Sequence, residues 1–185
     1  EAGVPAFART VSQVGTETIG VLFAANTAVI VLLQFWVLHR IEGHRRTRVG
    51  LVMLVIWFAA WGAMGLSGLL PATLAAAVLV VLFGALFGLG ETLLQPTLPA
   101  ITNDMAPDHL RGRVNAAQST AFMSGGVLGP IAAGVLLDRG LGAVFIAVII
   151  AGLVVTAWVM LRLERLISPE VNGVTASAPD AVAAR

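Results

Sequence analysis

The stretch ATLAAAVLVVLFGALFGL, residues 72–89, contains eighteen residues and no charged side chain. A helix needs roughly 20 apolar residues to cross a hydrocarbon core of about 30 Å, whereas the strands of a membrane barrel are about half as long and alternate in polarity. Similar apolar runs occur on both sides of this stretch. We therefore predict an all-α integral membrane protein, a polytopic helical bundle with spans at about 18–38, 49–70, 72–102, 115–137 and 141–161.

The composition agrees with a membrane protein, with 58% hydrophobic residues, 11% charged residues and a mean hydropathy of +0.92. The chain has no cysteine, and its three histidines lack metal-ligand spacing, so we expect no metal. We find no nucleophile–base pair and no phosphate loop. These observations argue against an enzyme, and we predict no cofactor.

The arginines predict the orientation of the bundle. Eight lie on one side of the predicted membrane, and the opposite side holds only Arg9 and Arg139. Such a bias predicts that the loops 39–48 and 103–113 and the C-terminus lie in the cytoplasm. We expect a multi-pass protein of the cell inner (plasma) membrane. Because topology accounts for the arginines, we expect membrane lipid and no nucleic acid as a partner. The eight are Arg40, Arg45, Arg46, Arg48, Arg111, Arg113, Arg162 and Arg165.

The two ends of the chain differ from the spans in composition. Residues 1–17 are mixed, which suggests the end of a preceding helix followed by an external loop. Residues 166–185 are rich in Pro, Glu, Asn, Gly, Ser and Ala, without a periodic apolar face. Such a composition is typical of a disordered tail, here on the cytoplasmic side.

Glu91 follows the apolar stretch without a break in the helical pattern. A carboxylate at that depth is costly when ionised, so it faces a wet cavity, pairs with an arginine or holds a proton. The functional interpretation is a proton-carrying group in a transport pathway. The alternative is a structural carboxylate that is hydrogen-bonded to a neighbouring helix.

Other residues in the spans suggest a kink and helix contacts. Prolines 96 and 99 lack an N–H donor and are expected to bend the third span. Small residues in the fourth span provide a smooth stripe along which another backbone can approach closely, as a hinge or as static packing. The prolines are Pro96 and Pro99, and the stripe contains Gly125, Gly126, Gly129, Pro130 and Gly134.

Asn26 and Gln34 lie a little over two turns apart in the first span and project from nearby faces. Both are candidates for lining a cavity, and interhelical hydrogen bonding is the alternative.

The loop Asn103–Arg113 contains two acids and two arginines around a proline and a glycine. Asp104 and Asp108 can engage Arg111 or Arg113, which predicts a cytoplasmic gate closed by ion pairs. A solvated turn is the alternative.

These motifs resemble a known family. The sequence GE (90–91), QPT (95–97), APDHLRGR (106–113) and GP (129–130) is similar to the tenth and eleventh helices of major facilitator superfamily transporters, in particular the bacterial drug/proton antiporter-like group. GVLFAANT (20–27) resembles their eighth helix. The resemblance covers about residues 15–165 and implies the C-terminal half of a major facilitator superfamily fold, beginning at the end of helix seven.

The resemblance implies secondary active transport of a small molecule by alternating access, coupled to protons and in the direction of efflux. The missing N-terminal six-helix half, a small-molecule substrate and protons are the implied partners. Glu91 would be the coupling carboxylate. The alternative is a truncated, transport-incompetent membrane fragment or a membrane interaction protein.

Overall fold

The computed structural model describes residues 3–174, which are helical apart from short connections and contain no strand. Five helices in this range are long and apolar enough to cross a membrane, with mean hydropathies between 1.6 and 2.8. The predicted all-α, polytopic fold is thereby confirmed. The elements are α1 (Gly3–Thr10), α2 (Thr16–Ile41), α3 (Arg46–Ser67), α4 (Leu74–Met105), the 3₁₀ turn η1 (Asp108–Leu110), α5 (Arg111–Asp138) and α6 (Gly142–Leu166).

Several helices extend beyond the apolar runs that predicted them. α2 continues to Ile41, α5 begins at Arg111, and α6 continues to Leu166. The apolar runs mark only the part of each helix that suits a hydrocarbon environment, whereas the backbone hydrogen bonds of a helix continue through polar residues at its ends.

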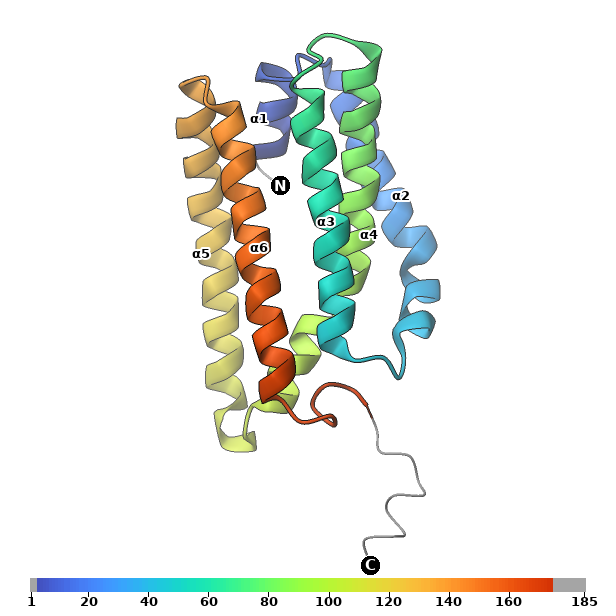
Figure 1. Cartoon of the computed structure of the whole chain (residues 1–185), viewed down its shortest axis with the longest axis vertical. Coiled ribbons are helices and arrows are strands. Elements are labelled where there is room, and N and C mark those ends of the chain that lie inside the picture. The colour runs from blue at the N-terminus through green and yellow to red at the C-terminus, as the bar shows by residue number, and fades with distance from the viewer. Residues whose placement is uncertain (1–2, 175–185) are drawn as a thin grey trace, which may run out of the picture.

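The helices form an elongated bundle with two unequal parts, a larger one of α2, α3 and α4 and a smaller one of α5 and α6 (Figure 1). α4 packs against α2 on one side and α3 on the other, and α3 also contacts α6. α5 stands at the edge of the bundle, where it contacts α1, α6 and the end of α4. The eight arginines counted above lie at the end of the bundle where α3 and α5 begin, which we call the arginine-rich end.

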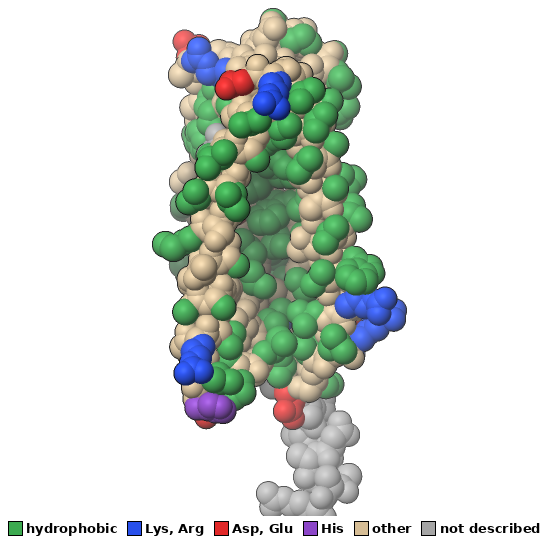
Figure 2. All heavy atoms as spheres, turned by 90° about the vertical axis from the view of Figure 1, so that its left-hand side faces the viewer, with side chains coloured by type: hydrophobic (Ala, Val, Ile, Leu, Met, Phe, Trp, Pro, Cys, Tyr) green, Lys and Arg blue, Asp and Glu red, His purple; other side chains and the backbone are tan. Residues whose placement is uncertain are grey.

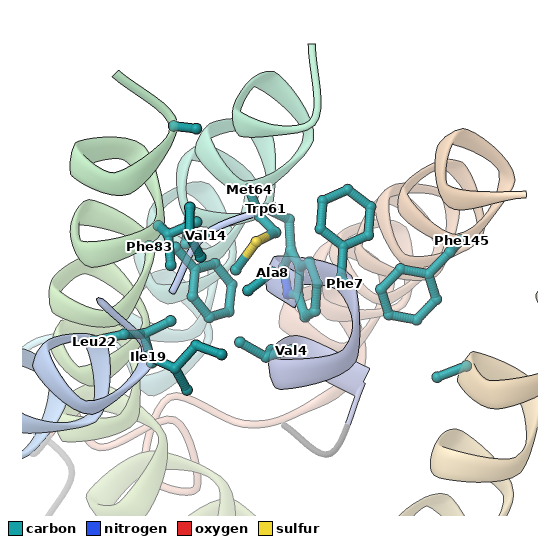
Figure 3. Packing of buried hydrophobic residues seen from close by; sticks show 14 of the residues in the cluster. Val4, Phe7, Ala8, Val14, Ile19, Leu22, Trp61, Met64, Phe83 and Phe145 are labelled. Carbon is teal, nitrogen blue, oxygen red and sulfur yellow. The ribbon is translucent and has the colours of Figure 1, made fainter. Parts of the chain in front are cut away.

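The main hydrophobic core lies near the opposite end of the bundle, around α1 (Figure 3). Phe7 of α1 is 1% exposed and lies 5.9 Å, ring centroid to centroid, from Phe145 of α6. Trp61 of α3 makes edge contacts with Phe83 of α4 and with Phe145. The short helix α1 thus joins the two parts of the bundle at this end.

A buried pair of hydroxyl groups fixes the loop after α1 to the end of α3. The oxygens of Ser12 and Ser67 are 2.7 Å apart, and Ser67 also donates to the carbonyl of Met64 at 2.7 Å. Because the single proton of Ser67 goes to Met64, Ser12 is the donor to Ser67. Both hydroxyls are therefore satisfied in an otherwise apolar environment.

α2 and α4 approach each other closely at two glycines of α4. A β-carbon at Gly84 would lie near the backbone oxygen of Leu22, and one at Gly88 would lie 2.6 Å from the backbone oxygen of Asn26. Real β-carbons do not come so close to a backbone atom. This spacing of four residues brings two helix backbones together in the manner known from membrane proteins.

The glycine stripe of α5 does not make such a contact within residues 3–174. Nothing lies within 4 Å of a β-carbon built at Gly125, Gly126, Gly129 or Gly134. The expected packing along this stripe is therefore not seen in this part of the chain. Only Ala133 and Leu137 of α5 are buried, because α5 stands at the edge of the bundle.

The chain after α6 differs from the predicted disordered tail. Residues 167–174 form turns that return to the start of α3, and Asn172 is 3% exposed. Composition suggested disorder because this segment has no apolar face, but polar contacts hold it instead. Residues 175–185 of the predicted tail lie outside the described residues.

Candidate functional site

The central polar contact of the bundle joins α2 to α4. The amide nitrogen Nδ2 of Asn26 donates to Oε2 of Glu91 at 3.0 Å, and both residues are partly buried. Glu91 lies about 26 Å along α4 from Leu74, at 1.5 Å per residue. The structure thus brings together two of the three residues predicted to act in transport.

The close approach at Gly88 explains why this pair can form. Gly88 precedes Glu91 by three residues, so both lie on the same side of α4. Without a side chain at position 88, the backbone of α2 at Asn26 can lie directly against α4. The amide of Asn26 then lies within hydrogen-bonding distance of the carboxylate.

The other side of α4 at this level is held by aromatic residues of α3. Trp57 stacks on Phe87 with ring centroids 5.0 Å apart and 8° between the planes. Its Nε1–H donates to the carbonyl oxygen of Phe87 at 3.1 Å. In an α-helix that carbonyl also accepts from the N–H of residue 91. The Trp57 contact therefore positions the turn that carries Glu91.

We predict that Trp57→Phe lowers the free energy of unfolding by about 1 kcal/mol, because it removes the hydrogen bond to Phe87 and keeps an aromatic ring. Titration with a denaturing detergent, followed by circular dichroism, measures this value. Trp36→Phe is the matched control, because Trp36 is 63% exposed, and its effect should stay within about 0.5 kcal/mol. Equal losses in both variants would contradict the role of the hydrogen bond.

Gln34 does not join this pair in the described part of the chain. It is partly buried on α2, eight residues after Asn26 and nearer the arginine-rich end. Its assignment to a cavity wall stays a prediction.

The two prolines lie between Glu91 and the arginine-rich end of α4. α4 is continuous through Pro96 and Pro99. Figure 1 shows that its last turns leave the axis of the upper part and run beneath α3 toward α5. A proline removes one backbone hydrogen bond and crowds the preceding turn, which accounts for the bend.

The predicted gate residues form two separate ion pairs. Asp108 and Arg111 are paired at 3.0 Å within the turn η1 and the start of α5, and both side chains are more than half exposed. Asp104 pairs with Arg46 of α3. The expectation that Asp104 engages Arg111 or Arg113 is therefore corrected, because the end of α4 runs beneath α3 and presents Asp104 to Arg46. Arg113 is exposed on α5.

Glu164 was not singled out from the sequence, yet it makes the third ion-pair contact at this end. Its Oε1 accepts from Arg45 and from Arg48, each at 3.1 Å. The carboxylate is on α6 and the two arginines lie at the start of α3. The two ion pairs therefore fix α6 to α3. A single Glu near the end of an arginine-bearing helix carries no spacing signal from which its partner could be inferred.

The glycine stripe of α5 borders a hollow of about 280 Å³ between α5 and α6. Figure 2 shows it as a long depression with hydrophobic side chains at its floor. Gly3 of α1, Trp61 of α3 and Phe145 of α6 contribute to its lining, together with Gly125, Gly126, Gly129 and Pro130. Gly134 is half-buried and is not part of the lining.

Comparison with known proteins gives one match. The family model described as Major Facilitator Superfamily matches residues 4–183. No curated protein and no solved structure matches the chain. The matched range includes all five spans and the pair Asn26–Glu91.

Proposed function

The chain belongs to the major facilitator superfamily, and from this premise we propose that it is part of a secondary active transporter that moves a small molecule by alternating access. We propose proton-coupled efflux as the mode, with Glu91 as the basis for proton coupling and the family resemblance as the basis for the direction. The observation that carries the proposal is the carboxylate of Glu91, which lies inside a span and is held by an amide of the neighbouring helix.

An ionisable group within a membrane span is costly and marks a functional site by default. Asn26 of the neighbouring helix donates a hydrogen bond to one carboxylate oxygen of Glu91. A carboxylate held in this way can take up and release a proton as its surroundings change. The family resemblance of residues 90–138 favours efflux.

We propose that the arginine-rich end faces the cytoplasm, because positively charged residues favour that side. The ion pairs Asp104–Arg46 and Asp108–Arg111 then lie at the inner surface. Separation of these pairs would accompany opening of the cytoplasmic side. The bend at Pro96 and Pro99 lies between Glu91 and this end of α4. The bend is therefore the candidate hinge.

We propose that a further six-helix half completes the transport pathway. The hollow between α5 and α6 and the uncovered glycine stripe support this proposal, because they offer a smooth surface against which other helices can pack. A substrate would then bind near the middle of the membrane between the two halves.

The proposal is tested with the complete transporter in liposomes, using ethidium, rhodamine 6G and fluorescein as cationic and anionic probes. We expect a pH gradient to drive accumulation of at least one probe and a protonophore to abolish it. The 185-residue chain alone should give no accumulation, since it would supply only part of the pathway. If the complete transporter moves all three probes equally with and without the gradient, proton coupling is wrong.

A further inference from the structure

We propose that residues 168–174 form a strap that caps α3 and, through Arg46, controls the freedom of the end of α4. This inference does not depend on the proposed transport activity. It rests on contacts at the arginine-rich end that connect α3, α4 and the segment after α6.

The start of α3 has no cap from its own preceding residue. The first N–H groups of a helix have no partner within the helix and are usually satisfied by a Ser, Thr, Asp or Asn at the preceding position. Here that position is occupied by Arg45, whose side chain makes no capping hydrogen bond. The N–H groups of Arg46 and Thr47 therefore depend on another source.

Asn172, which lies 125 residues after Thr47, satisfies both groups. Its backbone oxygen accepts from the N–H of Arg46 at 2.9 Å, and its side-chain oxygen accepts from the N–H of Thr47 at 3.0 Å. Its amide nitrogen donates in return to the hydroxyl of Thr47 at 3.0 Å. Thr47 is fully buried and Asn172 is 3% exposed, so water does not replace these bonds while the strap is docked.

Gly173 makes this docking possible. Its φ of +83° lies in a region that residues with a side chain rarely adopt. A β-carbon there would lie 3.2 Å from two side-chain atoms of Arg46. The strap also carries its own turns, in which the N–H of Asn172 donates to Ser168 at 3.0 Å and that of Gly173 donates to Glu170 at 2.9 Å. It is therefore a formed structure rather than an extended chain.

Arg46 connects the strap to α4. Its guanidinium donates to the backbone oxygen of Val171 in the strap at 2.9 Å and also to the carboxylate of Asp104 near the end of α4. Undocking of the strap removes one of these contacts and uncaps the turn that carries Arg46. The ion pair between Arg46 and Asp104 then weakens, and the turns of α4 beyond Pro99 become more mobile.

Hydrogen exchange of the full chain, measured by mass spectrometry in nanodiscs, tests the strap directly. In Asn172→Ala we expect exchange at the start of α3, in peptides covering residues 42–52, to become about tenfold faster, since two capping bonds weaken together. Peptides covering residues 98–106 should exchange about threefold faster, because coupling through Arg46 is partial.

Two further variants and a matched control keep the test sharp. Gly173→Ala should give the same pattern by expelling the strap without deleting a hydrogen-bonding group. Asn172→Asp retains the side-chain acceptor and should stay within about twofold of the parent. Asn115→Ala removes the hydrogen bond that the side-chain amide of Asn115 donates to Asn103, at the same end of the bundle but outside the strap. Hydrogen exchange at residues 42–52 should be unchanged in this variant.

Unchanged exchange at residues 42–52 in both Asn172→Ala and Gly173→Ala would overturn the strap. Faster exchange there with no change at residues 98–106 would overturn the coupling to α4. Retention of the parent's size-exclusion profile shows that each variant is still folded, so that local exchange is being compared.

Discussion

Replacing Glu91 by glutamine in the complete transporter is expected to lower proton-driven transport about tenfold or more, the scale of a coupling free energy of 1–3 kcal/mol. Glutamine has nearly the same shape and keeps an oxygen that can accept from Asn26, so the contact between α2 and α4 survives. What it cannot do is take up and release a proton. Initial rates of probe accumulation with and without a pH gradient measure the effect.

Glu17→Gln is the matched control, because Glu17 undergoes the same chemical change in an exposed position in the first turn of α2. Transport by this variant should equal that of the parent. Both variants should be recovered from the membrane in parental amounts. Proton-driven transport that persists at the parental rate in Glu91→Gln would remove Glu91 from the coupling mechanism.

The second large effect is expected at Gly88. Gly88→Ala places a β-carbon 2.6 Å from the backbone oxygen of Asn26 and 3.0 Å from its amide nitrogen. Because the clash is with backbone, α2 and α4 must separate, and we expect a loss of about 1–3 kcal/mol in the free energy of unfolding. Titration with a denaturing detergent, followed by tryptophan fluorescence, reports the loss.

Gly129→Ala separates this clash from the general effect of alanine in a helix. Both substitutions gain up to about 1 kcal/mol of helix propensity. Nothing lies within 4 Å of a β-carbon at Gly129, so the 185-residue chain should be unchanged or slightly more stable in that variant. Equal destabilisation by both substitutions would show that the close approach of α2 and α4 does not hold the bundle together.

The existence of the five spans could be predicted because one physical requirement dominates in lipid. Every backbone polar group must be satisfied within the segment, and only long apolar helices meet that requirement here. The ends of the helices were harder to predict from the sequence, as the extension of α6 to Leu166 shows. Polar residues near the membrane surface neither require nor forbid another helical turn.

The contacts of the site were only partly predictable. Asn26 and Glu91 were singled out separately, but their hydrogen bond depends on the register between α2 and α4, which the glycine contacts of α4 set. Asp104 was assigned to nearby arginines of its own loop, whereas its partner Arg46 lies 58 residues earlier. The docking of Asn172 had no signal, because one asparagine in a polar segment looks the same whether or not it caps a distant helix.

The uneven packing of the bundle has a consequence for how the protein is made. α2, α3 and α4 hold most of their contacts among themselves, and all three precede residue 106. They can therefore assemble in the bilayer while the ribosome is still synthesising the rest of the chain. α5 is synthesised later and has few buried side chains, so the last hairpin can be added after the three earlier helices have packed together.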